Sequence, residues 1–195
     1  ADHILIGALL VAVLDVGEIG PDYLPGHAHA DTLSFELSVY GQRVVVNGGT
    51  SRYGASAERV RERGTAAHST VAIDGQDSSE VWGGFRVARR ARPFDLRIEE
   101  VGDVVVVSCA HDGYRRLPGR PVHRRRWCLT QEGLEIADSV EGTFKEAVAR
   151  FHLHPDVRLE GEGRRGRLVL PGGEVVVWEV PEGAGRIVES AWHPE

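Results

Sequence analysis

Short segments rich in β-forming residues follow one another along almost the whole chain. They occupy residues 32–39, 43–46, 69–73, 94–98, 104–108, 122–130, 134–139, 147–154, 157–159, 167–170, 175–180 and 186–190. Glycine-containing turns such as Tyr40-Gly41-Gln42 and Asp74-Gly75-Gln76 separate them. Because no helical period lies between these segments, the sequence predicts an all-β fold, an antiparallel two-sheet β-sandwich.

Two stretches interrupt this pattern. Residues 4–14 are apolar but too short to span a bilayer, so we expect a buried strand or a pair of strands there, and no membrane span. Residues 51–67 are polar and include a predicted helical turn at 57–63. Long ordered loops of this kind often carry function. No repeat or linker divides the 195 residues, so we expect one domain over residues 1–195.

Composition limits the function. A hydrophobic content of 42% and a charged content of 27% are typical of globular proteins. The net charge of -6 argues against a nucleic-acid binder. Lys145 is the only lysine, and arginines gather at 59–63, 86–92 and 124–126. Genome composition is one explanation for these arginines, and recognition of carboxylates or sulfates is the other.

Cys109 and Cys128 flank the turn signal at 117–120. If 104–112 and 122–130 form a hairpin about that turn, the two cysteines face each other across it. Cross-strand neighbours can be close enough for a disulfide, and two buried reduced thiols are the alternative.

Histidines His27 and His29 are two residues apart, ahead of the alternating segment 32–39. In an extended chain this spacing sends both imidazoles to one side, in the row continued by Leu33 and Phe35. Imidazoles at the mouth of a sheet suit a metal, a proton transfer, or both.

Three further polar residues are expected at the same end of the sheet as His27 and His29. A hairpin of 32–39 with 43–46 returns Asn47 to the neighbourhood of His29. His68 opens the next predicted strand, and Tyr53 belongs to the intervening loop. The sequence therefore predicts that these side chains meet at one edge of the sandwich.

Other groups have both a structural and a functional interpretation. His152 and His154 alternate on a predicted strand, and His111 with Asp112 stands near a turn. The aromatic residues of the segment 81–85 either fill the core or form a platform on which a sugar stacks.

The HxH motif suggests comparison with the cupins, which are metal-binding β-barrels. Their glutamate follows the second histidine by three or four residues, whereas Glu36 follows His29 by seven. Glu36 also falls on the opposite strand face, so the cupin match fails. A cupin-like enzyme would bind metal through both His27 and His29.

The chain resembles the C-terminal β-sandwich domain of the heparinase II/III family of polysaccharide lyases. The resemblance covers nearly the whole sequence in order. It rests on the segments 26–31, 33–37, 66–71, 74–76, 111–114 and 150–155, which include Gly-His-Ala-His-Ala-Asp and Ala-Ala-His-Ser-Thr-Val.

The resemblance implies roles for individual residues. His27 matches a histidine at the catalytic cleft, and Tyr53 matches a loop tyrosine that acts as general acid or base. His29, Asn47 and His68 match the positions that hold zinc in some members. The family usually has Asp where this chain has Asn47, and a neutral amide is a poorer zinc ligand than a carboxylate.

Arginines of the polar loop complete the candidate site. Arg52 and Arg63 are the candidate substrate-binding residues, because a guanidinium fork suits carboxylates and sulfates.

The implied reaction is β-elimination on a uronic-acid-containing polysaccharide. In the family, an α/α toroid forms the other wall of the cleft, and nothing in these residues predicts a helical barrel. We therefore expect the isolated chain to be weakly active or inactive as a lyase. A non-catalytic carbohydrate-binding or assembly module is the alternative.

The resemblance also carries expectations about context. It implies a periplasmic or secreted protein, although the chain shows no signal peptide. A sandwich face that normally packs on a toroid can instead pack on a second copy of the chain, so the resemblance is also compatible with a homo-oligomer.

Overall fold

Two four-stranded antiparallel sheets form the body of the protein. The computed structural model describes residues 2–7, 9–20 and 25–189. The first sheet has the order β1-β2-β3-β4, with β1 (Asp2–Ile6), β2 (Leu10–Asp15), β3 (Phe35–Val39) and β4 (Gln42–Val45). The second has the order β11-β10-β9-β8, with β8 (Pro93–Val101), β9 (Val104–His111), β10 (Val122–Leu129) and β11 (Leu134–Glu141).

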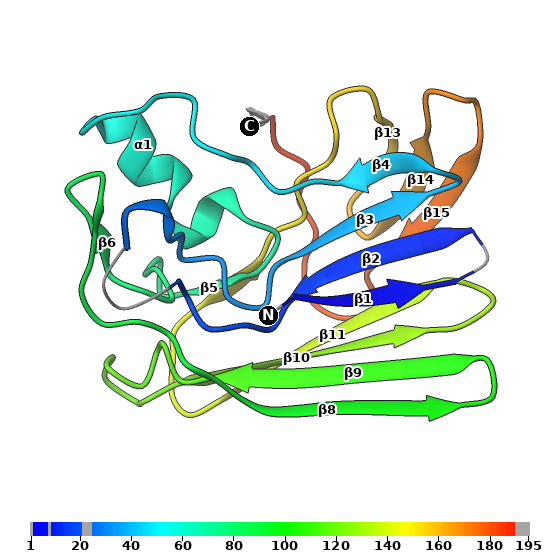
Figure 1. Cartoon of the computed structure of the whole chain (residues 1–195). Coiled ribbons are helices and arrows are strands. Elements are labelled where there is room, and N and C mark those ends of the chain that lie inside the picture. The colour runs from blue at the N-terminus through cyan, green and yellow to red at the C-terminus, as the bar shows by residue number, and fades with distance from the viewer. Residues whose placement is uncertain (1, 8, 21–24, 190–195) are drawn as a thin grey trace.

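Smaller elements flank these sheets at opposite ends (Figure 1). The right-hand end in that view carries the sheet of β13 (Arg158–Glu162), β14 (Arg165–Val169) and β15 (Val175–Glu179). The left-hand end carries α1 (Ala57–Glu62), the 3-10 helices η1 (Pro25–His27) and η2 (Thr65–Ala67), and the hairpin of β6 (Val81–Trp82) with β7 (Arg86–Val87). Strand β5 (Val71–Ile73) pairs with β12 (Ala147–Ala149).

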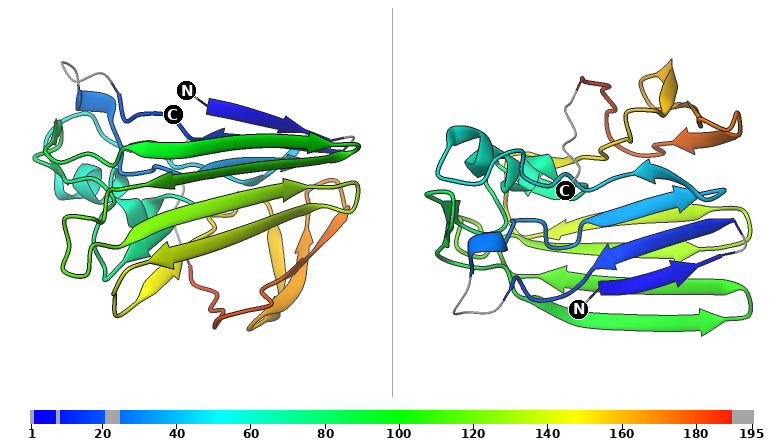
Figure 2. Two further views of the ribbon diagram at one scale, coloured as in Figure 1. Left: turned by 90° about the horizontal axis from the view of Figure 1, so that it is seen from below. Right: turned by 45° about the horizontal axis from the view of Figure 1, so that its top comes forward.

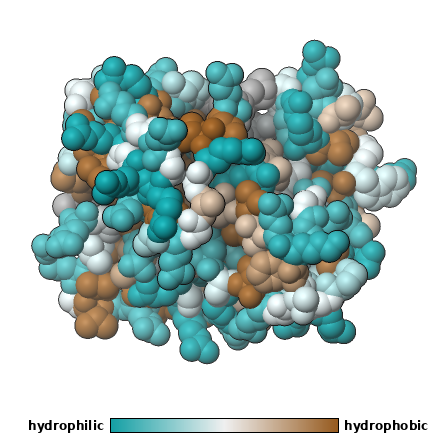
Figure 3. Space-filling view, turned by 180° about the vertical axis from the view of Figure 1, so that it is seen from behind, coloured by the Kyte–Doolittle hydropathy of each residue, from teal (hydrophilic) through white to brown (hydrophobic). Residues whose placement is uncertain are grey.

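The main core lies between the sheets, and Figure 2 shows the layers from two further sides. Leu14 of β2 and Phe35 of β3 pack in one cluster with Val107 of β9 and Trp127 of β10. Leu168 of β14 closes the same cluster. Each of these side chains is buried, so apolar burial holds the two large sheets and the small one together. The face seen from behind is mostly hydrophilic, with scattered apolar groups (Figure 3).

The predicted all-β sandwich is confirmed, and so is the strand pair within residues 4–14, which forms β1 and β2. The predicted hairpin forms β3 and β4. Tyr40 (φ 53°) and Gly41 (φ 72°) make its two-residue turn, whose positive φ angles match the twist of the strands. The helical turn predicted at 57–63 forms α1, and Ser56 caps it by accepting from the backbone N–H of Arg59.

Some predicted strands are wrong. Residues 186–189 form no strand, and residue 190 lies outside the described residues. The strand predicted at 147–154 ends at Ala149. The hairpin of β6 and β7 was not predicted, because each of its strands has only two residues.

The two cysteines do not face each other. The predicted hairpin forms from β9 and β10, but Cys109 lies opposite Arg125 and Cys128 lies opposite Val106. Both thiols are free and buried. His111 pairs with His123, so the connection is centred on residue 117, whereas facing cysteines would need a centre between residues 118 and 119. Cys109 and Cys128 are therefore two buried reduced thiols and not a disulfide.

A chain of buried hydrogen bonds crosses the second sheet. The backbone N–H of Gly113 donates to His111 Nδ1 (3.2 Å), and His111 Nε2 lies 3.2 Å from His123 Nδ1. His123 Nε2 lies 2.7 Å from Asp138 Oδ1. In this arrangement both imidazoles are neutral and each carries its proton on Nε2. His111 then donates to His123, and His123 donates to Asp138. Burial lowers the pKa of both histidines, His111 well below its usual value.

Arg125 ties this chain of bonds to the loop end of the molecule. Its Nε and Nη2 donate to the two oxygens of Asp138, at 2.7 and 2.9 Å. Its Nη1 donates to the backbone carbonyls of Leu33 (2.9 Å) and Ser69 (2.6 Å). The guanidinium thus joins the second sheet to the segments that follow Asp31 and His68. The Arg125 side chain has no exposed surface.

The histidines make stability sensitive to acid. Burial is the main cause that lowers the pKa of the five histidines 29, 68, 111, 123 and 152 in the folded chain. The unfolded chain takes up protons on these side chains as the pH falls below about 6.5. We therefore expect the free energy of unfolding to fall between pH 7 and pH 5.

Two carboxyl groups oppose this trend. Burial raises the pKa of Asp15 to about 7 and also raises the pKa of Asp31, so the folded chain holds protons there that the unfolded chain releases. Five histidines outweigh two carboxyl groups. Urea unfolding at several pH values measures the slope, and stability that is constant or rises toward pH 5 contradicts the expectation.

Candidate functional site

The segment that carries His27 and His29 is not a strand. His27 ends η1, and β3 begins only at Phe35. Leu33 between them has a φ of 63°, which breaks the extended alternation that the sequence predicts. His27 is exposed, whereas His29 is half-buried. The two imidazoles nevertheless line the same pocket.

His29, Asp31 and His68 form a cluster at this end of the sandwich. Their ligand atoms all lie within 4.8 Å of one another. His29 Nδ1 is 3.3 Å from His68 Nε2. The two histidines come from the segment before β3 and from the residue that follows η2, so they are adjacent only in the folded chain.

Asn47 orients one of these histidines. Its Oδ1 lies 2.5 Å from His68 Nδ1, and an amide oxygen can only accept. The proton of His68 therefore sits on Nδ1, and the lone pair on Nε2 points toward His29. Asn47 holds His68 from outside the cluster, and Asp31 supplies the carboxylate inside it.

The electrostatics favour neutral imidazoles. Burial and the neighbouring His68 lower the pKa of His29 to about 4. Burial lowers the pKa of His68 to about 3. Neutral nitrogens and a carboxylate at this spacing are the donor set that zinc takes. The residues present therefore fit a zinc ion.

A pocket of about 360 Å³ opens beside the cluster. His27, His29 and Asn47 line it, together with Ser34 and Phe35. Its remaining polar lining consists of carboxyl groups from Asp2, Asp15, Glu18, Asp31 and Glu36, and the pKa values of Asp15 and Asp31 are raised by burial. A cation bound in the pocket would favour the ionised form of these groups.

Arg59 of α1 bonds to three segments at this end of the sandwich, around residues 26, 50–52 and 84, which together form the rim. Its buried guanidinium donates to the backbone carbonyls of Gly26 (2.9 Å) and Arg52 (3.2 Å), which directly precede His27 and Tyr53. It also donates to Thr50 Oγ1 (2.7 Å) and, through Nε, to the carbonyl of Gly84 (2.8 Å). One side chain thus holds together the turn of His27, the loop of Tyr53 and the hairpin of β6 and β7.

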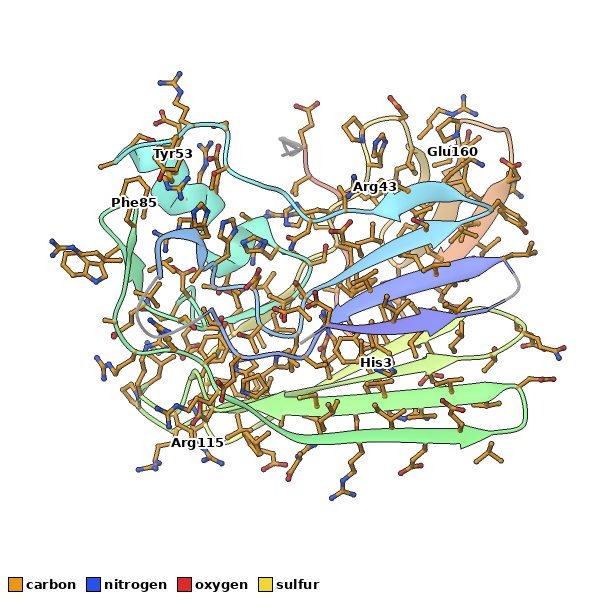
Figure 4. The ribbon with its side chains drawn as sticks, in the orientation of Figure 1. His3, Arg43, Tyr53, Phe85, Arg115 and Glu160 are labelled. Atoms are coloured by element: carbon orange, nitrogen blue, oxygen red, sulfur yellow. The ribbon has the colours of Figure 1, made fainter. Side chains whose placement is uncertain are left out.

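Tyr53 lies on the surface of this end. Its side chain is 82% exposed, and its ring centroid is 5.3 Å from that of Phe85 (Figure 4). The Arg59 guanidinium lies 5.6 Å from the Tyr53 ring centroid. Arg59 thus links the backbone before Tyr53 to the backbone before His27, but Tyr53 is not among the residues that line the pocket.

The two predicted substrate-binding arginines have different environments. Arg52 is exposed beside Tyr53. Arg63 is completely buried, and its Nε donates to the carbonyl of Ala28 (2.8 Å), between His27 and His29. This contact supports the histidine segment, and substrate binding by either arginine stays a prediction.

Sequence reasoning missed Asp31 as a member of the histidine cluster and Arg59 as the organiser of the rim. Asp31 was visible two residues after His29, but its inward direction depends on the turn at Leu33. Arg59 had no local signal, since its partners are backbone carbonyls. Glu62, also missed, accepts from both the N–H (2.9 Å) and the hydroxyl (2.6 Å) of Ser51.

The other histidine pairs have structural contacts. The backbone N–H of His152 bonds to Ser69 Oγ, and His152 Nε2 bonds to the carbonyl of Ala66. The N–H of Asp156 donates to His154 Nδ1. No helix within residues 2–7, 9–20 and 25–189 is long and apolar enough to cross a membrane.

Solved structures share this fold. A heparan sulfate lyase from Pedobacter heparinus superimposes with a TM-score of 0.68 at 19% identity, over 86% of this chain and 25% of that one. A heparinase III structure gives 0.60 at 18% identity, over 87% of this chain and 30% of that one. The chain spans about a quarter to a third of these proteins.

Sequence comparison agrees with the fold. FtsZ-localized protein C from Caulobacter vibrioides is 30% identical, over 88% of this chain and 32% of its own length. Residues 3–195 match the family described as heparinase II/III-like, C-terminal. The chain belongs to the heparinase II/III-like C-terminal domain family.

Proposed function

We propose that this chain is the β-sandwich part of a polysaccharide lyase that cleaves uronic-acid-containing polysaccharide by β-elimination. The observation that carries the proposal is the Arg59 guanidinium, which bonds to the carbonyls of Gly26 and Arg52, the residues before His27 and Tyr53, while His27 itself lines the pocket. Family membership and the fold shared with a heparan sulfate lyase support it.

In this reaction a base takes the proton from the carbon next to the uronate carboxylate. A carbon–carbon double bond forms, and the glycosidic C–O bond breaks as an acid protonates the departing oxygen. His27 is exposed at the pocket and is the proposed base. Tyr53 is the proposed acid, and the nearby Arg59 charge stabilises negative charge that develops on its oxygen.

Ionised carboxylates of the pocket repel a uronate, and a bound cation offsets this repulsion. We propose that His29 Nδ1, His68 Nε2 and Asp31 hold zinc, with Asn47 orienting His68. When bound, zinc supplies positive charge that offsets the carboxylates and steadies the segment preceding β3.

A further part of a longer protein is expected to complete the cleft. Ile4 and Ile6 lie directly opposite Val13 and Val11 on β1 and β2, and all four side chains are exposed. An apolar face of this kind suits a packed neighbour. We propose that an α/α toroid covers it, and association of two copies is the alternative.

Product formation tests the lyase function. The natural full-length protein and this chain are incubated with heparan sulfate, alginate and hyaluronan, and unsaturated uronate is followed by ultraviolet absorbance. We expect product from the full-length protein and weak or no product from the chain alone. Absence of product with all three polysaccharides for the full-length protein contradicts the proposal.

Metal binding gives a separate prediction. We expect about one zinc ion per chain, and His68→Ala should abolish binding because it removes one of three ligands. Asn47→Ala should weaken binding about 10–100-fold, the usual cost of losing the partner that orients a ligand. Asn47→Asp should tighten it, since a carboxylate makes His68 a better donor. Competition with a chromophoric chelator measures each affinity, and wild-type affinity in His68→Ala refutes the assignment.

The second candidate function is a non-catalytic carbohydrate-binding or assembly module. The relative from Caulobacter vibrioides favours it, because the name of that protein describes a location with FtsZ and not a reaction. The module predicts polysaccharide or protein binding by the full-length protein with no unsaturated product.

A further inference from the structure

The hairpin of β6 and β7 presents an aromatic ring and an arginine to solvent. Trp82 and Arg86 are cross-strand partners, and the Arg86 guanidinium lies 4.8 Å from the Trp82 ring centroid. Trp82 is 50% exposed. Gly83 (φ 59°) and Gly84 (φ 75°) turn the chain between them. The exposed half of this ring is apolar surface that a ligand can cover.

This hairpin is fixed to the rim of the candidate site. Arg59 donates to the carbonyl of Gly84 and lies 4.8 Å from the ring centroid of Phe85. A methyl group added at Gly84 would lie 3.0 Å from the Cα of Ala55, so the turn packs tightly on the Tyr53 loop. A methyl group added at Gly26 would lie 3.7 Å from Phe85 Cδ1, so Phe85 faces the segment that leads into His27. The turn between Trp82 and Arg86 is therefore bonded to the same guanidinium as the segments that precede His27 and Tyr53.

The charge of Arg86 is available to a ligand. Nearby, Glu80 is occupied by Arg89 (2.9 Å) and Arg116 (3.7 Å). Among the ion pairs of the described residues, none includes Arg86. A guanidinium that stacks on a ring through its face keeps the N–H donors of its edge free, and that edge binds carboxylate or sulfate in a fork.

We propose that Trp82 and Arg86 form a binding site for an acidic sugar unit of a polysaccharide that runs over the rim beyond the pocket. Arg86 takes the carboxylate or sulfate, and the exposed part of Trp82 packs on the sugar ring. The inference rests on the proposed polysaccharide ligand, but it concerns binding and requires no cleavage. The site also places anionic groups on arginine rather than in the acidic pocket.

Titration of the chain with a size-defined heparan sulfate oligosaccharide tests the site, with a neutral dextran oligosaccharide as the comparison ligand. We expect Arg86→Ala and Trp82→Ala each to weaken binding about tenfold. Arg86→Lys should recover only part of the loss, because lysine keeps the charge without the fork. Calorimetry measures the affinities, and thermal unfolding checks that each variant remains folded.

Arg158→Ala is the matched control, since Arg158 is 69% exposed and lies on β13, far along the chain from the hairpin. We expect its affinity to stay within about twofold of wild type. Equal losses for Arg158→Ala and Arg86→Ala indicate diffuse charge attraction and overturn the site. Unchanged binding in Arg86→Ala also overturns it.

The two proposals fail separately. Weakened binding in the hairpin variants without any unsaturated product leaves the site standing and removes the lyase function. Product formation together with unchanged binding in the hairpin variants leaves the lyase function standing and removes the proposed binding site.

Discussion

Asp138→Ala should lower the free energy of unfolding by about 3–5 kcal/mol, the usual cost of removing one partner of a buried ion pair. Asp138 is the acceptor for both Arg125 and His123. Without it, the guanidinium of Arg125 stays buried and loses its countercharge. In a chain of this length we expect the melting temperature to fall by about 6–20 °C.

Glu135→Ala on the same strand is the control. Glu135 pairs with Arg126 at 3.3 Å, but its side chain is 71% exposed, so we expect a loss of less than about 1 kcal/mol. Urea unfolding of both variants measures the difference. Similar losses in the two variants would show that the buried network contributes no more than a surface pair.

His27→Ala is expected to reduce formation of unsaturated uronate by the full-length protein about 10²–10⁴-fold, the range for loss of a general acid or base. His27 is exposed, so the variant should unfold at the wild-type temperature. Tyr53→Phe should give a loss of similar size, because it removes the hydroxyl and keeps the ring that contacts Phe85.

Tyr40→Phe is the matched control for Tyr53→Phe. Tyr40 is 44% exposed in the turn between β3 and β4, at the opposite end of these strands from the segment of His27. We expect its rate to stay within about twofold of wild type. A full-length His27→Ala protein that keeps more than half of the activity rules out the proposed base.

The sequence predicts the strands well because their signals are local. Alternating apolar residues and the Tyr40-Gly41 turn act within a few positions, so the hairpin of β3 and β4 could be located. The register of β9 and β10 could not, since it depends on how the chain around Gly113 packs against Ser78 and Ala91.

The candidate site was predictable only in its most recognisable residues. His27, His29 and His68 stand out by type and spacing, and the resemblance adds Tyr53. Arg59 and Arg125 do not stand out among the many arginines of the chain. Their roles come from bonds to carbonyls that are distant in sequence, and no local pattern encodes those bonds.

The bonds of Arg59 have a consequence for motion. The turn before His27, the loop of Tyr53 and the β6–β7 hairpin all bond to one guanidinium, so displacement of Arg59 breaks a hydrogen bond of all three at once. Such segments open as one cooperative unit. Their amide protons should therefore exchange with solvent at similar rates, as those of a single structural block rather than of three independent loops.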